Sequence, residues 1–269
     1  MGFYTGRLRL REDGTIPKRT QPRPARRFSR TRAAPFALLL AGLASLAPAR
    51  PAAAQTVDLL LVLAIDCSYS VDYEEYDLQR KGIAYALEDP EIREAIASGP
   101  NGAIALSVVQ WSSARSQVLA LPWTLLDGPA AVSATAQRIA TLERATQDGA
   151  TSISTAIAFA MGVMQRSPYQ AVRRIIDVSG DGRNNNGPPV ERYRNAAAQQ
   201  GITINALAIL NEEPTLDYYY KAKVIAGFGA FVERANTYPD YQTAIRRKML
   251  KEIRYVPVSG TPPEEPAPG

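Results

Sequence analysis

The chain has 269 residues, enough for one large domain, and it contains no histidine and a single cysteine, Cys67. These counts exclude a Ser-His-Asp triad, a zinc site built on imidazole, an intramolecular disulfide and a CxxC site. The formal charge of +5 is uneven: the first 54 residues hold 11 of the 31 basic and two of the 26 acidic residues. The remaining sequence is therefore net acidic, and we expect no nucleic-acid binding.

The first 54 residues are typical of an export signal. An arginine-rich stretch precedes the 12-residue apolar run 36–47, and the alanines at 52–54 fit an A-x-A cleavage site. The apolar run is much shorter than the roughly 20 residues of a membrane-spanning helix. We predict a signal peptide over 1–54 and a mature protein that starts at Gln55, is periplasmic or secreted, and makes no stable membrane insertion. An uncleaved N-terminal anchor is the alternative.

The central block, 55–254, begins with a strand over 59–65, which is apolar at every position, as in a strand covered on both faces. The residues after it, Tyr73–Glu88, have the apolar spacing of a helix. Further predicted strands are 103–111, 117–125, 174–178, 202–210 and 230–234, and further predicted helices are 130–142, 153–165, 190–200, 216–225 and 241–253. This alternation predicts one α/β domain with a doubly wound, mostly parallel sheet and helices on both faces.

The end of the chain, 255–269, contains five prolines and no basic residue, which predicts an extended, disordered tail. In the central block no GxxxxGK[ST] loop occurs, and no glycine run has the GxGxxG spacing. A nucleotide-binding function is therefore disfavoured.

Oxygen-bearing side chains follow the predicted strands. Asp66-Cys67-Ser68-Tyr69-Ser70 comes directly after the first strand, Thr151 stands where a helix begins, and Asp181 follows the 174–178 strand. Ligands of a doubly wound sheet bind beyond the carboxyl ends of its strands, so these segments should meet at one edge. Carboxylates and hydroxyls are oxygen ligands that suit hard cations such as Mg²⁺ or Ca²⁺. The alternative is that Asp66 and the serines only cap the following helix.

This set of residues resembles the metal-ion-dependent adhesion site of von Willebrand factor A domains, and the resemblance covers about 56–253. The run IDVSGDGRNNNG resembles, more narrowly, an uncharacterised bacterial family of exported A-domain-like proteins. The resemblance implies that Ser68, Ser70 and Thr151 contact a metal, and that Asp66 and Asp181 coordinate it or hold its waters. It also implies Mg²⁺, or else Mn²⁺ or Ca²⁺, a short antiparallel edge strand, and an acidic residue of a partner protein on the metal.

Several residues depart from that family pattern or lie near it. Gly180 stands where threonine is common, and Cys67, expected to be a buried thiol, lies inside the motif. The Asn184–Gly187 run predicts a turn, although its amides are potential ligands. We expect packing roles for Trp111 and the tyrosines 218–220, and a solvated helix face at 246–248. Glu212 and Glu213 are expected at the same edge as the metal, either bordering the site or keeping their loop solvated.

The predicted function is that of a non-enzymatic exported binding protein whose metal docks the Asp or Glu side chain of a protein partner. A metal-assisted hydrolase or phosphatase is the second hypothesis. The motifs contain no histidine or lysine, and Ser68 stands where aspartyl-phosphate chemistry needs a second aspartate. A structural module with a stabilising metal is the third.

Overall fold

A computed structural model describes residues 54–146 and 149–254. The predicted signal peptide, apart from its last residue, and the predicted tail lie outside the described residues. Across the described residues no helix is long and apolar enough to cross a membrane.

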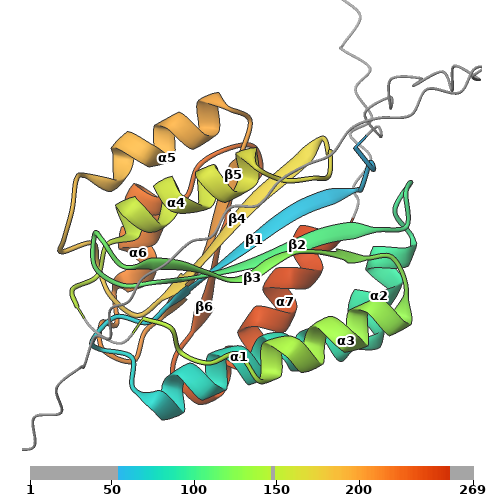
Figure 1. The fold of residues 1–269 in the computed structure, drawn as a ribbon. Coiled ribbons are helices and arrows are strands. Elements are labelled where there is room, and N and C mark those ends of the chain that lie inside the picture. Colours follow the sequence, from blue (N-terminus) through green and yellow to red (C-terminus); the bar gives the residue numbers. More distant parts are fainter. Residues whose placement is uncertain (1–53, 147–148, 255–269) are drawn as a thin grey trace, which may run out of the picture. The chain divides into compact units, whose positions relative to one another are not determined.

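The domain is built on a six-stranded sheet in the order β3-β2-β1-β4-β5-β6 (Figure 1). The strands are β1 (Leu59–Asp66), β2 (Ile104–Trp111), β3 (Gln117–Leu126), β4 (Arg173–Gly180), β5 (Thr203–Ile209) and β6 (Val232–Ala235). All neighbours are parallel except β3, which pairs antiparallel with β2. The predicted mostly parallel sheet is thus confirmed.

The expectation of a short antiparallel edge strand is wrong in its length. β3 has ten residues and is the longest strand that the structure describes. The connection from β2 is tight, since the backbone N–H of Ser112 donates to the carbonyl of Ser116 at 2.9 Å. A tight hairpin turns the chain back beside β2 at once, so β3 pairs along nearly all of that strand.

Helices cover both faces of the sheet (Figure 1). They are α1 (Tyr73–Glu88), α2 (Pro90–Ala97), α3 (Pro129–Ala140), α4 (Ile153–Gln165), α5 (Val190–Gln199), α6 (Leu216–Tyr219), which continues as a π-helical turn over Tyr220–Val224, and α7 (Tyr241–Ile253), preceded by a 3₁₀ turn over Tyr238–Asp240. The α1, α2, α3 and α7 helices lie on one face, and α4, α5 and α6 lie on the other.

The strand β1 is apolar at almost every position because both of its faces are buried. Leu59, Leu61, Leu63 and Ile65 belong to the apolar cluster under α1 and α7, whereas the alternating residues Leu60, Val62 and Ala64 belong to the cluster under α4. Because successive side chains of a strand point to opposite faces, a strand buried on both faces must be apolar throughout.

The carboxyl ends of β1 and β4 lie side by side, because Ile65 pairs with Ser179 in the parallel register. After β1 the chain continues into α1 on one face of the sheet, and after β4 it continues into α5 on the other. The strand order therefore reverses at this point, and the residues that follow the two strands meet above it.

Candidate metal centre

Three separate loops bring the predicted site residues together at this edge of the sheet. The Ser70 hydroxyl donates to Asp181 Oδ1 at 2.7 Å, and the Ser68 and Ser70 hydroxyl oxygens are 3.3 Å apart. The Thr151 hydroxyl oxygen lies 3.4 Å from the position that a Cβ on Gly182 would take, beside Asp181. Ser68, Ser70 and Asp181 are therefore in direct contact. Asp66 accepts the backbone N–H of Ser68 at 2.7 Å, and Thr151 lies beside the residue that follows Asp181.

The carboxylate of Asp66 is the most unusual group in this cluster. Asp66 is completely buried, and its Oδ1 accepts the backbone N–H of Ser68 at 2.7 Å. Its Oδ2 is buried without a hydrogen-bond partner among the described residues. A buried, unpartnered carboxylate oxygen is costly unless a cation compensates it, so Asp66 fits a metal ligand.

Burial and mutual repulsion disfavour charge on both carboxylates of the cluster. Burial, followed by the charge of Asp181, raises the pKa of Asp66 well above its usual range. Burial also raises the pKa of Asp181, although hydrogen bonds from Ser70 and Tyr238 oppose that shift. A divalent cation between them would reverse both effects, because it stabilises each ionised form.

The ligand set is low in charge. Among the described residues no three His, Cys, Asp or Glu side chains form a metal-binding group, so any metal here would be held by two carboxylates and neutral hydroxyls. Two carboxylates balance a divalent cation without excess negative charge. Such a site leaves the cation able to accept a further anionic ligand.

Arg144 holds the Asp66–Ser70 loop from one side, and sequence reasoning missed it. Its guanidinium donates to the carbonyls of Val71 at 2.6 Å, Cys67 at 3.1 Å and Ser68 at 3.2 Å. Its Nε donates to the carbonyl of Thr146 at 3.0 Å. Because all these acceptors are backbone carbonyls, which every residue has, the sequence contains no pattern from which the contacts of Arg144 could be predicted.

Two tyrosines close the site from the other side. The Tyr238 hydroxyl donates to Asp181 Oδ2 at 3.0 Å, and the Tyr220 hydroxyl donates to the carbonyl of Gly182 at 3.2 Å. A Cβ on Gly180 would lie 2.7 Å from Asp66 Oδ2 and 2.8 Å from the Tyr220 hydroxyl. Glycine at 180, the position where threonine is common in the resembled family, therefore makes room for Tyr220.

A family model described as "Protein of unknown function (DUF1194)" matches residues 56–257. The chain belongs to the DUF1194 family. Comparison with curated protein sequences finds no match for the DUF1194 chain.

Solved structures identify the fold of this DUF1194 protein as that of von Willebrand A domains. A von Willebrand factor type A protein from Catenulispora acidiphila superposes with a TM-score of 0.52 at 18% identity, over 73% of this chain and 43% of that one. The mussel byssus proximal thread matrix protein 1, described with a zinc-occupied MIDAS motif, superposes with a TM-score of 0.51 at 16% identity, over 73% of this chain and 48% of that one. The pilus adhesin SpaC from Lactobacillus rhamnosus GG superposes with a TM-score of 0.54 at 12% identity, over 74% of this chain and 31% of that one. The DUF1194 chain thus spans less than half of each of these chains, and the predicted fold resemblance is confirmed.

The asparagine run of the DUF1194 chain binds backbone groups. The side-chain oxygen of Asn185 accepts the N–H of Thr151 at 2.8 Å, and that of Asn184 accepts the N–H of Ser154 at 3.0 Å. The side-chain oxygen of Asn186 accepts the N–H of Ala114 at 2.8 Å. These amides position Thr151 and satisfy a free N–H at the start of α4, so their oxygens are already used by the protein.

Several other expectations are confirmed. Cys67 is completely buried, and burial raises the pKa of its thiol to about 12, so it is a protonated packing group. The expected packing role is confirmed for Trp111 and Tyr220, which lie in the core, but it is wrong for Tyr218, which is 70% exposed. Glu212 is exposed, and Glu213 pairs with Arg183, which follows the metal-site loop.

The expected solvated face at 246–248 is wrong for Lys248. This lysine is completely buried and pairs with two buried carboxylates, Asp177 at 2.6 Å and Glu252 at 2.5 Å. Lys248 lies on the side of α7 that packs against the sheet, with Tyr241 and Ile245. Three consecutive basic residues, 246–248, led to the prediction of an exposed face, although residue 248 points toward the sheet.

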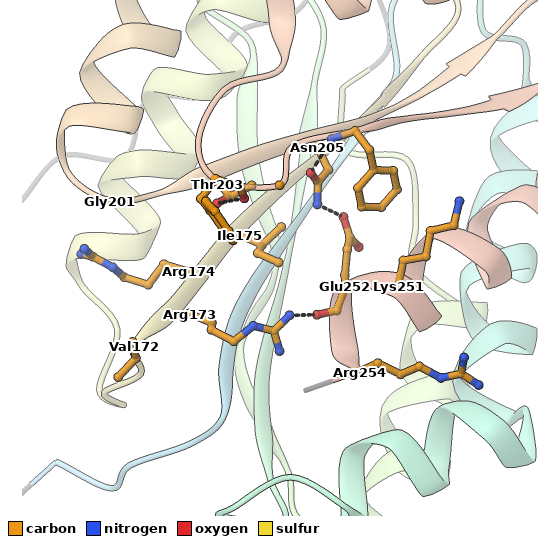
Figure 2. A pocket seen from close by; sticks show the side chains of 13 residues that line it. Val172, Arg173, Arg174, Ile175, Gly201, Thr203, Asn205, Lys251, Glu252 and Arg254 are labelled. Carbon is orange, nitrogen blue, oxygen red and sulfur yellow. Dashed lines mark hydrogen bonds between the residues drawn. The ribbon is translucent and has the colours of Figure 1, made fainter. Parts of the chain in front are cut away.

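A cavity of about 660 Å³ lies at the amino ends of β4 and β5, at the opposite end of these strands from the candidate metal centre (Figure 2). Asn205 donates to Glu252 at 2.9 Å in its wall, and Arg173 donates to carbonyls at the end of α7. Arg174 donates to the carbonyl of Gln200 at the end of α5. These arginines complete helix ends, and none of the five predicted site residues lines the cavity.

Proposed function

We propose that this protein is an exported binding protein in which Asp66, Ser68, Ser70, Thr151 and Asp181 hold a divalent metal that docks an acidic side chain of a protein partner. The observation that carries the proposal is the buried, unpartnered Asp66 Oδ2 beside the Ser70–Asp181 hydrogen bond. Mg²⁺ is the proposed cation, with Mn²⁺ or Ca²⁺ as the other hard cations that oxygen ligands suit.

The charge of the site explains why the partner group is acidic. Asp66 and Asp181 neutralise a divalent cation, and the three hydroxyls add no charge. The exposed residue among the five is Ser70, so the site opens to solvent beside it. An Asp or Glu side chain arriving there supplies the anionic oxygen that the cation favours.

A catalytic function has less support from the same residues. The Cys67 thiol is protonated at neutral pH, and burial raises the pKa of both Tyr220 and Tyr238. The chain has no histidine. The carboxylates of Glu75 and Glu212 interact electrostatically with Asp181 at the border of the cluster. No histidine stands beside them to share acid and base roles, so we propose a site that binds without turnover.

Export rests on the leader sequence, and the partner function is in keeping with the fold. One solved structure of the same fold is a pilus adhesin, and another is described with an occupied MIDAS motif. A partner outside the cytoplasm, in the periplasm or medium, is the one an exported domain would meet. Neither nucleic acid nor a membrane is the proposed ligand.

The test compares wild type with Asp66→Ala and a control, Asp127→Ala, whose residue is exposed and outside the site. Partners are captured from envelope extract in Mg²⁺ and in chelator. The proposal expects a protein retained by wild type and Asp127→Ala in Mg²⁺ only. Metal-dependent hydrolysis of a generic phosphate or carboxylate ester, lost in Asp66→Ala, would instead support the hydrolase hypothesis.

A further inference from the structure

The candidate metal centre has an acidic border on one side. Glu75 lies in the first turn of α1, which begins three residues after Ser70. Glu212 follows β5, whose carboxyl end pairs with that of β4 in the parallel sheet. Two different elements therefore bring these glutamates to the edge of the sheet that holds Asp181. We call Glu75 and Glu212 the border pair.

The border pair and Asp181 act on one another electrostatically. Burial raises the pKa of Glu75, and the charges of Asp181 and Glu212 are among those that raise it further. Burial also raises the pKa of Asp181, and the charge of Glu212 adds to that shift. The three carboxylates thus form one negative region at the site.

The negative charge of the border pair is not neutralised by the folded chain. Among the residues that the structure describes, neither glutamate forms an ion pair with a lysine or arginine. Glu75 accepts the backbone N–H of Asp72 at 2.9 Å, and Glu212 accepts the side-chain amide of Asn211 at 3.2 Å. These bonds hold the two side chains but bring no positive charge to them.

The guanidiniums around the site are engaged elsewhere. Arg183 pairs with Glu213, and Arg144 donates to backbone carbonyls of the metal loop. Arg115 is exposed on the connection between β2 and β3, which bonds to the backbone of Ser152 on the Thr151 side of the site. The side formed by the border pair therefore remains acidic.

A cation in the centre does not remove this charge. The buried, unpartnered Asp66 Oδ2 is the observation that points to a cation, and Asp66 and Asp181 together balance a divalent one. An acidic partner side chain that docks on the metal then brings a further negative charge next to the border pair. Like charges placed side by side cost affinity unless a positive group lies between them.

We propose that the border pair selects partner segments in which a basic residue accompanies the docking acid, and this inference rests on the proposed function. The segment places an Asp or Glu side chain on the metal and an Arg or Lys side chain against Glu75 and Glu212. An extended chain advances about 3.3 Å per residue, so a basic residue within three positions of the acid lies within about 10 Å of it.

The probes are fluorescent peptides with one Asp among glycines, in which Arg replaces the first, second or third glycine on either side. Each has a twin with citrulline, which has nearly the shape of arginine without its charge. Anisotropy measures their binding to the full exported chain, titrated to about 1 mM in Mg²⁺. The best Arg peptide should bind about three to ten times more tightly than its twin, as expected for exposed ion pairs. High salt should reduce this ratio.

The variants remove the charge of the border pair and keep the fold. Glu75→Gln retains the helix cap, because Gln serves as well as Glu at this position of a capping box. Glu212→Gln keeps the oxygen that accepts from Asn211. Each change should lower the ratio of Arg to citrulline affinity, and the double change should remove most of it. Glu94→Gln is the matched control, since Glu94 is an exposed carboxylate of α2 and should leave the ratio unchanged. Circular dichroism verifies that each variant is folded.

The outcomes distinguish the two proposals. Metal-dependent binding of the citrulline peptides with no gain from Arg, or a gain that survives the double variant, overturns the selection by the border pair and leaves the metal-docking function standing. Binding of no peptide in Mg²⁺, or equal binding of the citrulline peptides in chelator, overturns the metal-docking function and the inference built on it.

Discussion

The Ser70 hydroxyl donates a 2.7 Å hydrogen bond to Asp181 Oδ1 across 111 positions of sequence. This bond joins the loop after β1 to the loop after β4, and the charge of Asp181 acts on Asp66, whose Oδ2 has no hydrogen-bond partner among the described residues. The two loops are held by groups outside the cluster, Arg144 on one side and Tyr238 on the other. Their positions are therefore set by the folded chain before any cation binds.

Asp66→Ala should abolish Mg²⁺ binding and leave a folded domain. The change removes a carboxylate that the proposed site needs, and it also removes a buried, unpartnered oxygen that repels Asp181. Calorimetric titration with Mg²⁺ and Mn²⁺ measures the binding, and thermal unfolding reports on the fold. Wild-type affinity in this variant would make the Asp66 motif a helix cap.

Thr151→Ala should weaken Mg²⁺ binding by about tenfold without abolishing it, because water can replace a neutral ligand oxygen. The backbone N–H of Thr151 keeps its bond to Asn185 in the variant, so the loop should stay in place. The same titration decides the point. An affinity equal to that of wild type would remove Thr151 from the ligand set.

Arg144→Gln should lower both metal affinity and stability. The variant loses charge-assisted hydrogen bonds to three carbonyls of the metal loop, and each such bond contributes about 1.5–3 kcal/mol. Arg115→Gln is the control, since Arg115 is exposed. If the Arg144 variant loses stability but binds Mg²⁺ as wild type does, Arg144 supports the fold without positioning the loop.

Gly180→Thr should destabilise the domain by about 1–3 kcal/mol, the usual cost of overpacking. The new Cβ would meet Asp66 Oδ2 at 2.7 Å and the buried Tyr220 hydroxyl at 2.8 Å. Gly128→Thr is the comparison, because a Cβ at Gly128 meets no atom within 4 Å. Equal denaturant midpoints for the two variants would show that the site accommodates threonine by a small shift.

Stability should fall as the pH rises from about 4.5 to about 7. Burial raises the pKa of Glu252 from 4.5 to about 7, so the folded chain binds a proton there that the unfolded chain has released. That proton contributes up to about 3 kcal/mol to the free energy of unfolding. The contribution is fully present below the unfolded-state pKa of 4.5 and is lost as the pH rises through the folded-state pKa of about 7. Denaturant unfolding at pH 5 and pH 8 measures it.

Glu252→Gln should reduce this pH slope. Burial also raises the pKa of Asp66, Asp177 and Asp181, which act in the same direction, so part of the slope should remain. An unchanged slope in the variant would mean that Glu252 is ionised in the folded chain throughout this range.

Much of the fold was accessible from sequence because apolar periodicity encodes it. The predicted bounds of α1, α4 and α7 coincide with the observed ones, since each helix buries an apolar face against the sheet. The helix α2 was missed, although Asp89-Pro90 is a helix start and Ile92 and Ile96 lie on one face. This helix has only eight residues and begins directly after α1, so its sequence is hard to distinguish from a loop between α1 and β2.

The candidate metal cluster was accessible for a different reason. Asp66 and Asp181 follow strands that are adjacent in a parallel sheet, and strand ends meet at one edge. The groups that hold the cluster were not accessible. Arg144 binds backbone carbonyls, and Tyr238 reaches Asp181 from a turn 57 residues away. Only the folded chain shows these contacts.

The edge strand β3 carries its own protection against joining the sheet of another molecule. Pro122, near its middle, has no N–H to donate, and its carbonyl already accepts the Thr124 hydroxyl at 2.9 Å. The pairing with β2 is irregular on both sides of Val108, opposite this point. A copy that tried to extend the ladder would lose its register here. This long edge strand should therefore resist edge-to-edge aggregation.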